Sequence, residues 1–559
     1  MLKFVKEAAH TKSQTKVRPN NTIEVIQPGN ISEHSGMLRS MKCIRNLLLL
    51  FVLLGINACG SSDDASPSLT VLNRGINAEP ESLDAHKAKS LQAADVLRDV
   101  GEGLVSFTAS GELTAGAAKS WEVSDDLLTY TFHIRPDAKW SNGDKLTAEH
   151  FVFAVKRLVD PATAAFYAQF LEDVSELRAI DDHTLQIVLA RPTPYLLSLL
   201  THPATFPMHP GEIEKHGEAF ARPGILVTNG AYRLTGWIPG SLLTLSRNDH
   251  YWNNRNTAID EVRYHVLSQE TTEYSRYRAG ELDITSTVPT DNFAQVKKDL
   301  GDQLRVAPVL NIYYYGYNLT KPPFKDHPAL RQALSMAIDR ELLVEKVTGR
   351  GETPAYSWVP PGVDNYEPTL LSYAELTQEE RNQLARTLYA EAGYGAENPL
   401  QLELRYNTGD THRKIALAIQ SMWRDVLGFE VVLINEEFQV LLANVRDREV
   451  TQVFRSSWTG DYNDAHTFLS ILQSQNAANV PGYASDEYDA LLKRAAEQID
   501  LQRRRLYMEE AERVMLADHP AIPIYFYVSK HLVKPNVAGW GDNVLDYHYS
   551  QHLSIKAAE

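Results

Sequence analysis

Apolar and polar residues alternate over residues 130–135, which is the pattern of a β-strand with one buried face. An Asn-Gly pair at 142–143 follows and predicts a turn. After the turn, apolar residues at helical spacing run over 151–158, with Thr147 placed to cap the helix and Pro161 just beyond its end. The stretch therefore predicts a strand, a turn and a helix in close succession.

The same mixture of patterns continues along the chain. Short strand-like runs occur at 244–246 and 262–266, and helix-like runs occur at 378–392 and 487–517. Pro328 begins another helical stripe with the spacing of a helix packed on a core. Strands and helices mixed in this way favour an α/β or α+β fold. The chain is much longer than the ~250–300 residues at which single cores stop growing, so we expect two or more domains.

The first residues are organised like a secretory signal peptide. Basic residues precede the apolar run 47–56, and a small residue and a cysteine follow it. The run is shorter than the ~20 apolar residues that span a bilayer. Residues 37–58 are therefore predicted to be a lipoprotein signal peptide. Residues 1–36 are interpreted as an extension upstream of the true start, which would be Met37 or Met41.

Cys59 is expected to have one specific role. The sequence has two cysteines, and the other, Cys43, lies inside the predicted signal, so the exported chain would have no internal disulfide. Residues 56–59 resemble the processing box of bacterial lipoproteins, in which the cysteine is lipidated and becomes the first mature residue. The polar, Gly/Ser-rich segment 59–67 would then be a flexible tether between a lipid anchor and the folded body.

Composition and motifs exclude several functions. The net charge of −16 argues against nucleic-acid binding, which depends on basic patches. No His-Glu-x-x-His, Gly-x-Ser-x-Gly, Cys-x-x-Cys or Walker-type loop is present, so we predict neither a catalytic site nor a cofactor.

His548 and His552 are four residues apart, a spacing that suits two metal ligands on a helix. A strand fits their neighbours equally well, so no metal site is predicted. An exported peptidase with a spatially assembled triad remains the alternative from another class.

One long stretch identifies a family. The residues from Trp140 to Pro161 closely resemble the signature of the extracytoplasmic solute-binding proteins of the peptide/nickel class, and within it the oligopeptide-binding proteins of ABC importers. Further blocks recur in that family's order, at 228–234, 247–252, 277–283 and 330–340. The resemblance implies an α/β, two-lobed periplasmic-binding-protein-like fold of type II, with an extra domain, around a cleft that closes on its ligand.

The resemblance also implies the domain boundaries. Domain I would be discontinuous and would comprise residues 68–101, 210–311 and 528–559. Domain II would be residues 102–209, and domain III would be residues 312–527. A chain that crosses repeatedly between lobes can close on a ligand without unravelling.

The implied function is that of a lipid-anchored receptor. It would capture short peptides and deliver them to the permease and ATPase of an ABC importer, as an exported monomer in the periplasmic space or cell envelope, with no chemistry of its own and no nucleic-acid partner. The nearest alternatives are receptors of the same fold for a dipeptide, a cell-wall peptide, a nickel complex or a sugar oligomer.

Asp461 is the expected anchor of the ligand. In the oligopeptide-binding proteins the aspartate at this position, after a Trp-x-x tripeptide, holds the ligand's α-ammonium, and Asp464 is the fallback. The competing interpretation of Asp461 is a turn or cap residue. Arg455 and His412 are expected to meet a C-terminal carboxylate directly or through water. The other predicted peptide-binding residues are Tyr167, His202, Tyr313, Asn407, Phe438, Trp458 and Thr459.

Four positions depart from the best-known oligopeptide-binding pattern. Lys89 and Gly316 each stand where a glutamate is usual, Thr348 replaces a lysine that can reach a carboxylate, and Phe438 replaces a pocket tryptophan. The amine anchor is kept while the side-chain and C-terminal contacts change. The resemblance therefore implies a peptide with a free N-terminus, without a particular length or sequence.

Overall fold

A computed structural model describes residues 69–449 and 452–556, which belong to one compact unit, residues 69–559. The predicted upstream extension, signal peptide, lipidation site Cys59 and tether lie outside the described residues. Within the described part of the chain, no helix has both the length and the apolar character needed to cross a membrane.

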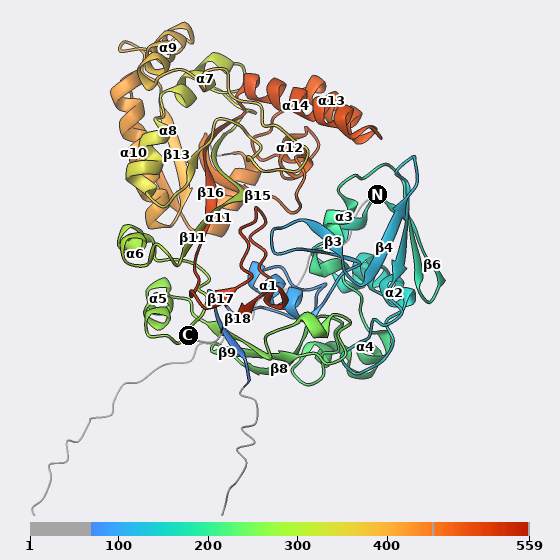
Figure 1. Ribbon diagram of the computed structural model, residues 1–559. Helices are drawn as coiled ribbons and strands as arrows, with labels where there is room; N and C mark the ends of the chain where they lie inside the picture. The colour runs from blue at the N-terminus through green and yellow to red at the C-terminus, as the bar shows by residue number, and fades with distance from the viewer. Residues whose placement is uncertain (1–68, 450–451, 557–559) are drawn as a thin grey trace, which may run out of the picture. The chain divides into compact units, whose positions relative to one another are not determined.

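Three sheets of four or more strands organise these residues (Figure 1). The first has the order β1-β10-β9-β8, with β1 parallel to β10: β1 Val71–Ile76, β10 Glu261–Val266, β9 Leu242–Arg247 and β8 Tyr232–Ile238. The second is antiparallel: β4 Ala118–Val123, β5 Thr129–Ile134, β7 Thr184–Leu189 and β6 Val174–Asp181. The third has six strands: β12 Thr353–Pro354, β16 Ala521–Leu532, β11 Leu304–Tyr317, β15 Val453–Thr459, β13 Leu402–Asn407 and β14 Val431–Glu436. Two small ribbons pair β2 Val105–Phe107 with β3 Leu113–Ala115, and β17 Val537–Ala538 with β18 Ser554–Ile555.

Helices connect the strands. The α-helices are α1 Leu91–Val100, α2 Ala148–Val159, α3 Leu196–Leu199, α4 Pro210–His216, α5 Glu270–Arg278, α6 Phe293–Leu300, α7 Pro328–Met336, α8 Arg340–Leu342, α9 Gln378–Glu391, α10 Asp410–Leu427, α11 Phe438–Asp447, α12 His466–Leu469, α13 Asp486–Ala496 and α14 Leu501–Asp518. Shorter helical turns are η1 Pro161–Thr163, η2 Ala168–Leu171, η3 Pro203–Thr205, η4 Gly217–Ala221, η5 Asn254–Asn256, η6 Thr290–Asn292, η7 Leu343–Thr348, η8 Ser470–Leu472 and η9 Ser550–His552.

The strand, turn and helix predicted from the first pattern are confirmed as β5, the turn at 142–143 and α2. Thr147 stands at the N-cap of α2, and its backbone N–H donates to His150 Nδ1 at 3.0 Å. The strands predicted at 244–246 and 262–266 are confirmed within β9 and β10.

The prediction of one continuous helix over 487–517 is wrong. The run 487–517 forms two helices, α13 and α14, that are separated before Leu501. The break follows from Asp500, whose carboxylate accepts the backbone N–H groups of Gln502 and Arg503 and so starts a new helix. The helix predicted at 378–392 is confirmed as α9.

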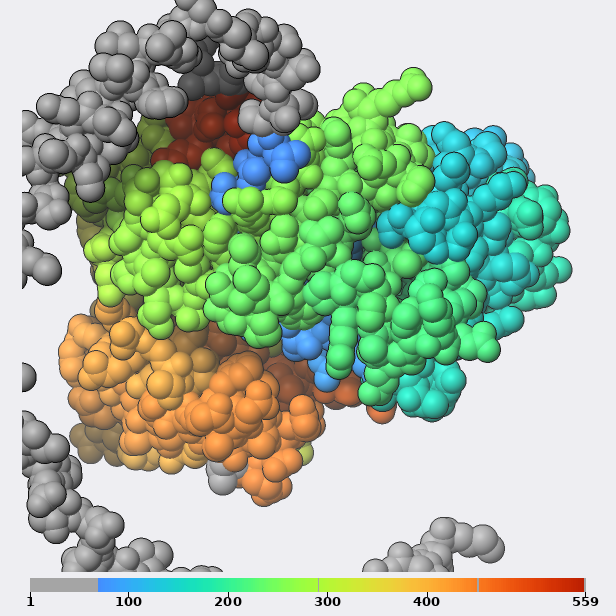
Figure 2. Space-filling view, turned by 90° about the horizontal axis from the view of Figure 1, so that it is seen from below, coloured from blue at the N-terminus to red at the C-terminus, as the bar shows by residue number. Residues whose placement is uncertain are grey.

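Two long strands connect the cores. Residues 310–317 of β11 lie in the large core of the six-stranded sheet, whereas Leu304 packs on a smaller core that also contains Leu532 of β16. The pairing of β11 with β16 shifts register between Pro308 and Ile312. The expected domain boundaries at 311/312 and 527/528 fall inside these strands and stay predictions. Figure 2 shows blue residues, from the start of the described chain, in two places: beside the dark red surface of the C-terminal residues, and between the green and the orange surfaces.

A buried carboxylate organises part of the large core. Glu512 in α14 accepts the backbone N–H groups of Trp358, Val359 and Thr369, each at 2.8 Å, and the hydroxyl of Tyr366 at 2.6 Å. Burial raises the pKa of this carboxyl to about 7, and the bonds that it accepts oppose that shift. Glu512 thus fixes the loop 358–369 on α14.

We predict that Glu512→Ala lowers the free energy of unfolding by about 4 kcal/mol or more, because four donors lose their acceptor and each buried donor left without one costs ~1–3 kcal/mol. Urea denaturation measures the change. The matched control is Glu510→Ala on the same helix, where a more exposed carboxylate pairs with Arg513. Removing such a pair should cost less than ~1 kcal/mol. Equal losses in the two variants would contradict the role given to Glu512.

Candidate functional site

A cavity of about 830 Å³ lies between two groups of loops. One wall comes from residues 169–199, around η2 and α3, and the other comes from residues 458–504, after β15. The volume lies in the range of small-molecule binding sites, ~300–1,000 Å³. Tyr195 of the first wall stacks on Tyr462 of the second, with ring centroids 4.5 Å apart and planes at 7°. The walls are therefore in contact at one end of the cavity.

Asp461 lines this cavity just beyond the end of β15. Its position is fixed through the backbone, because the N–H of Asp461 donates to the hydroxyl of Thr467 at 3.2 Å and the preceding Gly460 N–H donates to Leu310 O at 2.7 Å. The indole N–H of Trp458 shares the Thr467 hydroxyl at 3.4 Å. The carboxylate is thus presented to the cavity by a rigid turn.

The Asp461 carboxylate has no hydrogen-bond or ion-pair partner among the described residues. The side chain is exposed to the cavity, but the surrounding protein displaces bulk water and raises its pKa to about 6. At neutral pH this group is mostly an ionised, poorly solvated and uncompensated anion. A cation placed beside it would be strongly favoured.

Asp464 differs from Asp461 because its charge is already paired. Arg504 donates to its two oxygens at 2.7 and 2.8 Å, and the backbone N–H of His466 donates to it at 2.9 Å. This ion pair is buried and closes the second wall of the cavity. Asp461 therefore suits a cationic ligand group better than Asp464 does.

Tyr167 and His202 pack together near Asp461. Their ring centroids are 4.3 Å apart, and the Tyr167 hydroxyl donates to Lys89 O at 3.5 Å. Burial raises the pKa of Tyr167 to about 12, and the charge of Asp461 adds to the shift. Burial also lowers the pKa of His202 to about 3, with a contribution from Arg98. His202 is consequently neutral, and its Nδ1 accepts the N–H of Ala204 at 3.2 Å as the cap of η3.

Arg455 brings a second group of predicted residues together. Its guanidinium donates to Asn407 Oδ1 at 3.3 Å and lies 4.8 Å from the centroid of the Tyr313 ring. The Tyr313 hydroxyl lies 3.3 Å from His412 Nδ1. Burial and the charge of Arg455 lower the pKa of His412 to about 4, so His412 is neutral at pH 7.

The positive charge of Arg455 is not neutralised by any described residue. Its other donor bond goes to the Tyr527 hydroxyl at 3.1 Å, and its Nε is buried without a partner in the described chain. Hydroxyl and amide oxygens solvate the guanidinium but carry no charge. Arg455 is therefore an available partner for a carboxylate.

The remaining predicted residues have different settings. Trp458 lines the cavity, whereas Thr459 points elsewhere and its hydroxyl accepts the amide N–H of Asn311 at 2.8 Å. Phe438 is 44% exposed at the start of α11 and does not line the cavity. Gly316 makes room for Phe454, whose ring atoms would lie 2.3 Å from an added Cβ.

Several wall residues were not predicted from the sequence. Tyr195, which also lies 5.0 Å from the His466 ring, belongs to a loop after Pro194 that carries no recognisable pattern. Arg191 in that loop pairs with Asp173 at 2.7 Å. Tyr462 and His466 do lie within the stretch that predicted Asp461, and their aromatic character was the available signal.

The fold and this site define a solute-binding protein of the two-lobed periplasmic type, and the comparisons agree. Residues 112–479 match the family described as bacterial extracellular solute-binding proteins, family 5 Middle, and the chain belongs to this family. It is 38% identical over 503 residues to the periplasmic oligopeptide-binding protein OppA of Escherichia coli K12, a match that covers 87% of this chain and 92% of OppA.

Two further comparisons concern a murein peptide receptor. The chain is 37% identical over 513 residues to the periplasmic murein peptide-binding protein MppA of the same organism, covering 88% of this chain and 95% of MppA. The solved structure of MppA in its unliganded open form superposes with a TM-score of 0.78 at 36% identity, covering 87% of this chain and 98% of that one. The predicted family and the two-lobed α/β fold are thus confirmed.

The pKa of Asp461 generates a prediction about the empty protein. Between an unfolded pKa of ~3.9 and a folded pKa of about 6, the unfolded state releases the proton that the folded state keeps. Stability should therefore fall as the pH rises through this window, and Asp461→Asn should remove that part of the slope. Thermal unfolding of both proteins from pH 3 to 8 measures the difference. Parallel pH profiles would contradict the poorly solvated, unpaired state of Asp461.

Proposed function

We propose that this chain is the substrate-binding component of an ABC importer for short peptides. The observation that carries the proposal is the pair of uncompensated charges, Asp461 and Arg455, on one strand and its extension. A free peptide has the complementary charges at its two ends. The names of the relatives, which state oligopeptide and murein peptide binding, support the same ligand class.

Each charge has a defined role in this proposal. Asp461 binds the α-ammonium of the peptide and so sets its register. Arg455, with the neutral His412 and Asn407 beside it, binds the C-terminal carboxylate. The peptide between them is extended and hydrogen-bonds to the protein backbone as an added strand would. Arg455 and Asp461 are six positions apart, a backbone separation of at most about 20 Å in extended chain, and their side chains shorten the gap that a short peptide has to span.

Water exclusion adds to the affinity. The cavity walls come from two separate parts of the fold, and their approach around a ligand would remove water from the ionic contact at Asp461, whereas Arg455 does not line this cavity. Charge pairs are stronger where the effective dielectric constant is lower. The closed, loaded protein is the form that would be delivered to the membrane permease and its ATPase.

The two ionic contacts would also discriminate among the candidate classes of ligand. A dipeptide and a cell-wall peptide offer an ammonium and a carboxylate, whereas a sugar oligomer offers neither and a nickel complex has no need of an α-ammonium site. The named family members are binding proteins, and we propose that this chain likewise leaves its ligand chemically unchanged. An exported peptidase would instead require a nucleophile that no sequence motif provides.

We predict that Asp461→Ala weakens the binding of the tripeptide Ala-Ala-Ala by about 2–5 kcal/mol, or tens- to thousands-fold, because the ligand's ammonium is buried without its partner. N-acetylation of the tripeptide should cost a similar amount in the native protein and little in the variant. Isothermal titration of both proteins with both peptides forms a double-mutant cycle. Coupling near zero would show that Asp461 is structural.

The control for this cycle is Arg455→Ala with the C-terminally amidated tripeptide. Amidation should couple to Arg455 but not to Asp461, and acetylation should show the opposite selectivity.

A peptide recovered intact by mass spectrometry after prolonged incubation with the protein supports a receptor. Cleavage that scales with the amount of purified protein would favour the peptidase.

The proposed location is the cell envelope, with attachment through a lipid on Cys59. We predict that Cys59→Ala moves the protein from the membrane fraction to the soluble fraction without lowering its melting temperature, because residues 59–67 form a polar tether. Fractionation after a salt wash measures the change. Retention of the variant on washed membranes would argue against a lipid anchor.

A further inference from the structure

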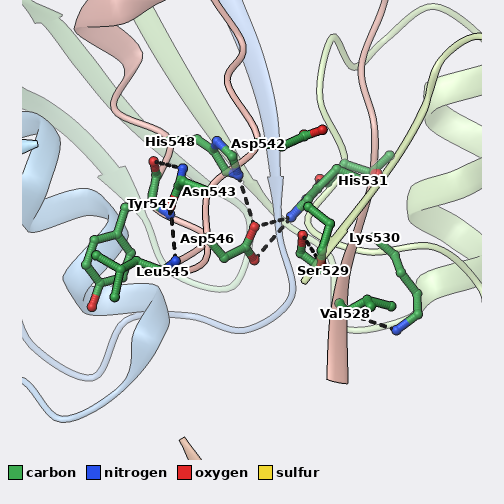
Figure 3. Close-up of polar contacts among 12 residues, drawn as sticks. Val528, Ser529, Lys530, His531, Asp542, Asn543, Leu545, Asp546, Tyr547 and His548 are labelled. Atoms are coloured by element: carbon green, nitrogen blue, oxygen red, sulfur yellow. Dashed lines mark hydrogen bonds and ion pairs between the residues drawn. The ribbon is translucent and has the colours of Figure 1, made fainter. Parts of the chain in front are cut away.

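Three side chains from two neighbouring segments near the C-terminus meet beside the end of β16. His531 belongs to β16, and Asp546 and His548 belong to the segment that follows Trp540. His531 Nε2 lies 3.0 and 3.2 Å from the two oxygens of Asp546, and His548 Nε2 lies 3.0 Å from Oδ1 of Asp546. Figure 3 shows both imidazoles pointing at this one carboxylate. One potential ligand atom from each residue lies within 4.8 Å of the others.

The surroundings hold the two rings in place. His531 Nδ1 lies 2.9 Å from Thr285 O, so the Nδ1 proton is directed to a backbone carbonyl and Nε2 is the ring nitrogen that faces the cluster. Histidines that bind metals typically donate their second ring N–H to a carbonyl or carboxylate in this way. The indole of Trp540 stacks on His548 with centroids 3.6 Å apart. The histidine side chains are only 12% and 6% exposed, whereas Asp546 is 33% exposed.

We propose that His531, Asp546 and His548 bind one divalent transition-metal ion of the Zn²⁺ type. With metal–ligand bonds of ~2.0–2.2 Å, neighbouring ligand atoms of a tetrahedral site are about 3.3 Å apart. The two histidine–carboxylate edges, at 3.0 and 3.2 Å, are close to this spacing, and all three ligand atoms lie within 4.8 Å of one another, so the rings have to move toward a shared ion by an ångström or so at most. The exposed edge of Asp546 provides access for the ion and room for a water molecule as a further ligand. Protons between the Nε2 atoms and the carboxylate would leave to solvent on binding.

The nearby charges are compatible with a cation. Arg74 lies behind the cluster, where its guanidinium donates to the backbone oxygen of His548 at 2.7 Å and to the hydroxyl of Ser550 at 2.9 Å. Its charge is offset by Asp99, 4.0 Å away. Once the ion has displaced the protons from the Nε2 atoms, two neutral imidazoles and one carboxylate carry a net negative charge beside it.

A metal ion bound by the cluster would connect two segments of the chain. The backbone N–H of Leu532, next to His531, donates to the Thr285 hydroxyl at 2.9 Å, and Leu310 of β11 donates to Val544 O at 2.9 Å. A bound ion would thus clamp the end of β16 to the C-terminal segment that pairs with β11 near its register shift. This inference is independent of the peptide site, since none of the three ligands lines that cavity.

His552 provides a matched control. It shares the C-terminal segment with His548, but its Nε2 lies 3.0 Å from Phe107 O and it is not part of the cluster. The four-residue spacing of His548 and His552 therefore does not bring these two histidines together in the cluster. His531, which precedes His548 by 17 residues and lies on a different segment, is the histidine that shares Asp546 with it.

The experiment titrates tag-free, chelator-stripped protein with ZnCl₂ in a calorimeter. We expect saturable binding of one ion per chain and a rise in melting temperature on addition of Zn²⁺. His548→Gln and Asp546→Asn should each weaken binding by ~10-fold or more, because loss of a ligand costs at least as much as loss of a supporting contact. His552→Gln should bind Zn²⁺ as the native protein does.

Three results would overturn the proposal. These are the absence of saturable binding to the native protein, binding that survives both His548→Gln and Asp546→Asn, and an equal loss in His552→Gln. Circular dichroism of the metal-free variants checks that they are folded. If His548→Gln does not fold, Asp546→Asn decides, since it keeps the size of the side chain and a neutral hydrogen-bonding group.

Discussion

The antiparallel pairing of β11 with β16 is the constraint on which the rest of the structure depends. These strands are long enough to contribute to more than one core, so packing in one part of the fold fixes the position of another. β15 pairs with the other edge of β11, where Tyr315 opposes Arg455 and Asn311 opposes Thr459. The strand that carries the candidate ligand charges is thereby aligned on the same frame that connects the cores.

The charged residues beside these strands are of two kinds, those that pair with each other and those that have no partner of opposite charge in the described chain. Asp464 and Arg504 neutralise each other's charge. Removal of either partner would leave the other as a buried, unpaired charge, so this ion pair has a structural role. Asp461 and Arg455 have no such partners in the described chain and are held in poorly solvated positions. The empty site carries this desolvation cost. A ligand with both charges relieves it, whereas a neutral ligand of the same size does not.

Local patterns predicted what local interactions determine. The strand, turn and helix around α2 and the helix α9 follow from periodicity and capping residues, and they formed as expected. The break at Asp500 was missed because its capping role competes with an otherwise helical pattern. Tyr195 and His531 were missed for another reason. Tyr195 stacks on Tyr462, which lies hundreds of residues away, and His531 meets Asp546 and His548 across a segment that is mostly without regular structure. No helical or strand periodicity encodes either contact.

The departures from the family pattern change where positive charge is located. Thr348, which replaces a lysine, donates its hydroxyl to Glu352, and Glu352 also pairs with Arg350 and Lys530. Two cations thus face one carboxylate in this group, and the charge of Arg350 contributes to the lowered pKa of His412. The hydroxyl of Thr348 carries no charge, so under the proposed function the attraction of a C-terminal carboxylate rests on Arg455, because the charges of Arg350 and Lys530 are partly offset by Glu352.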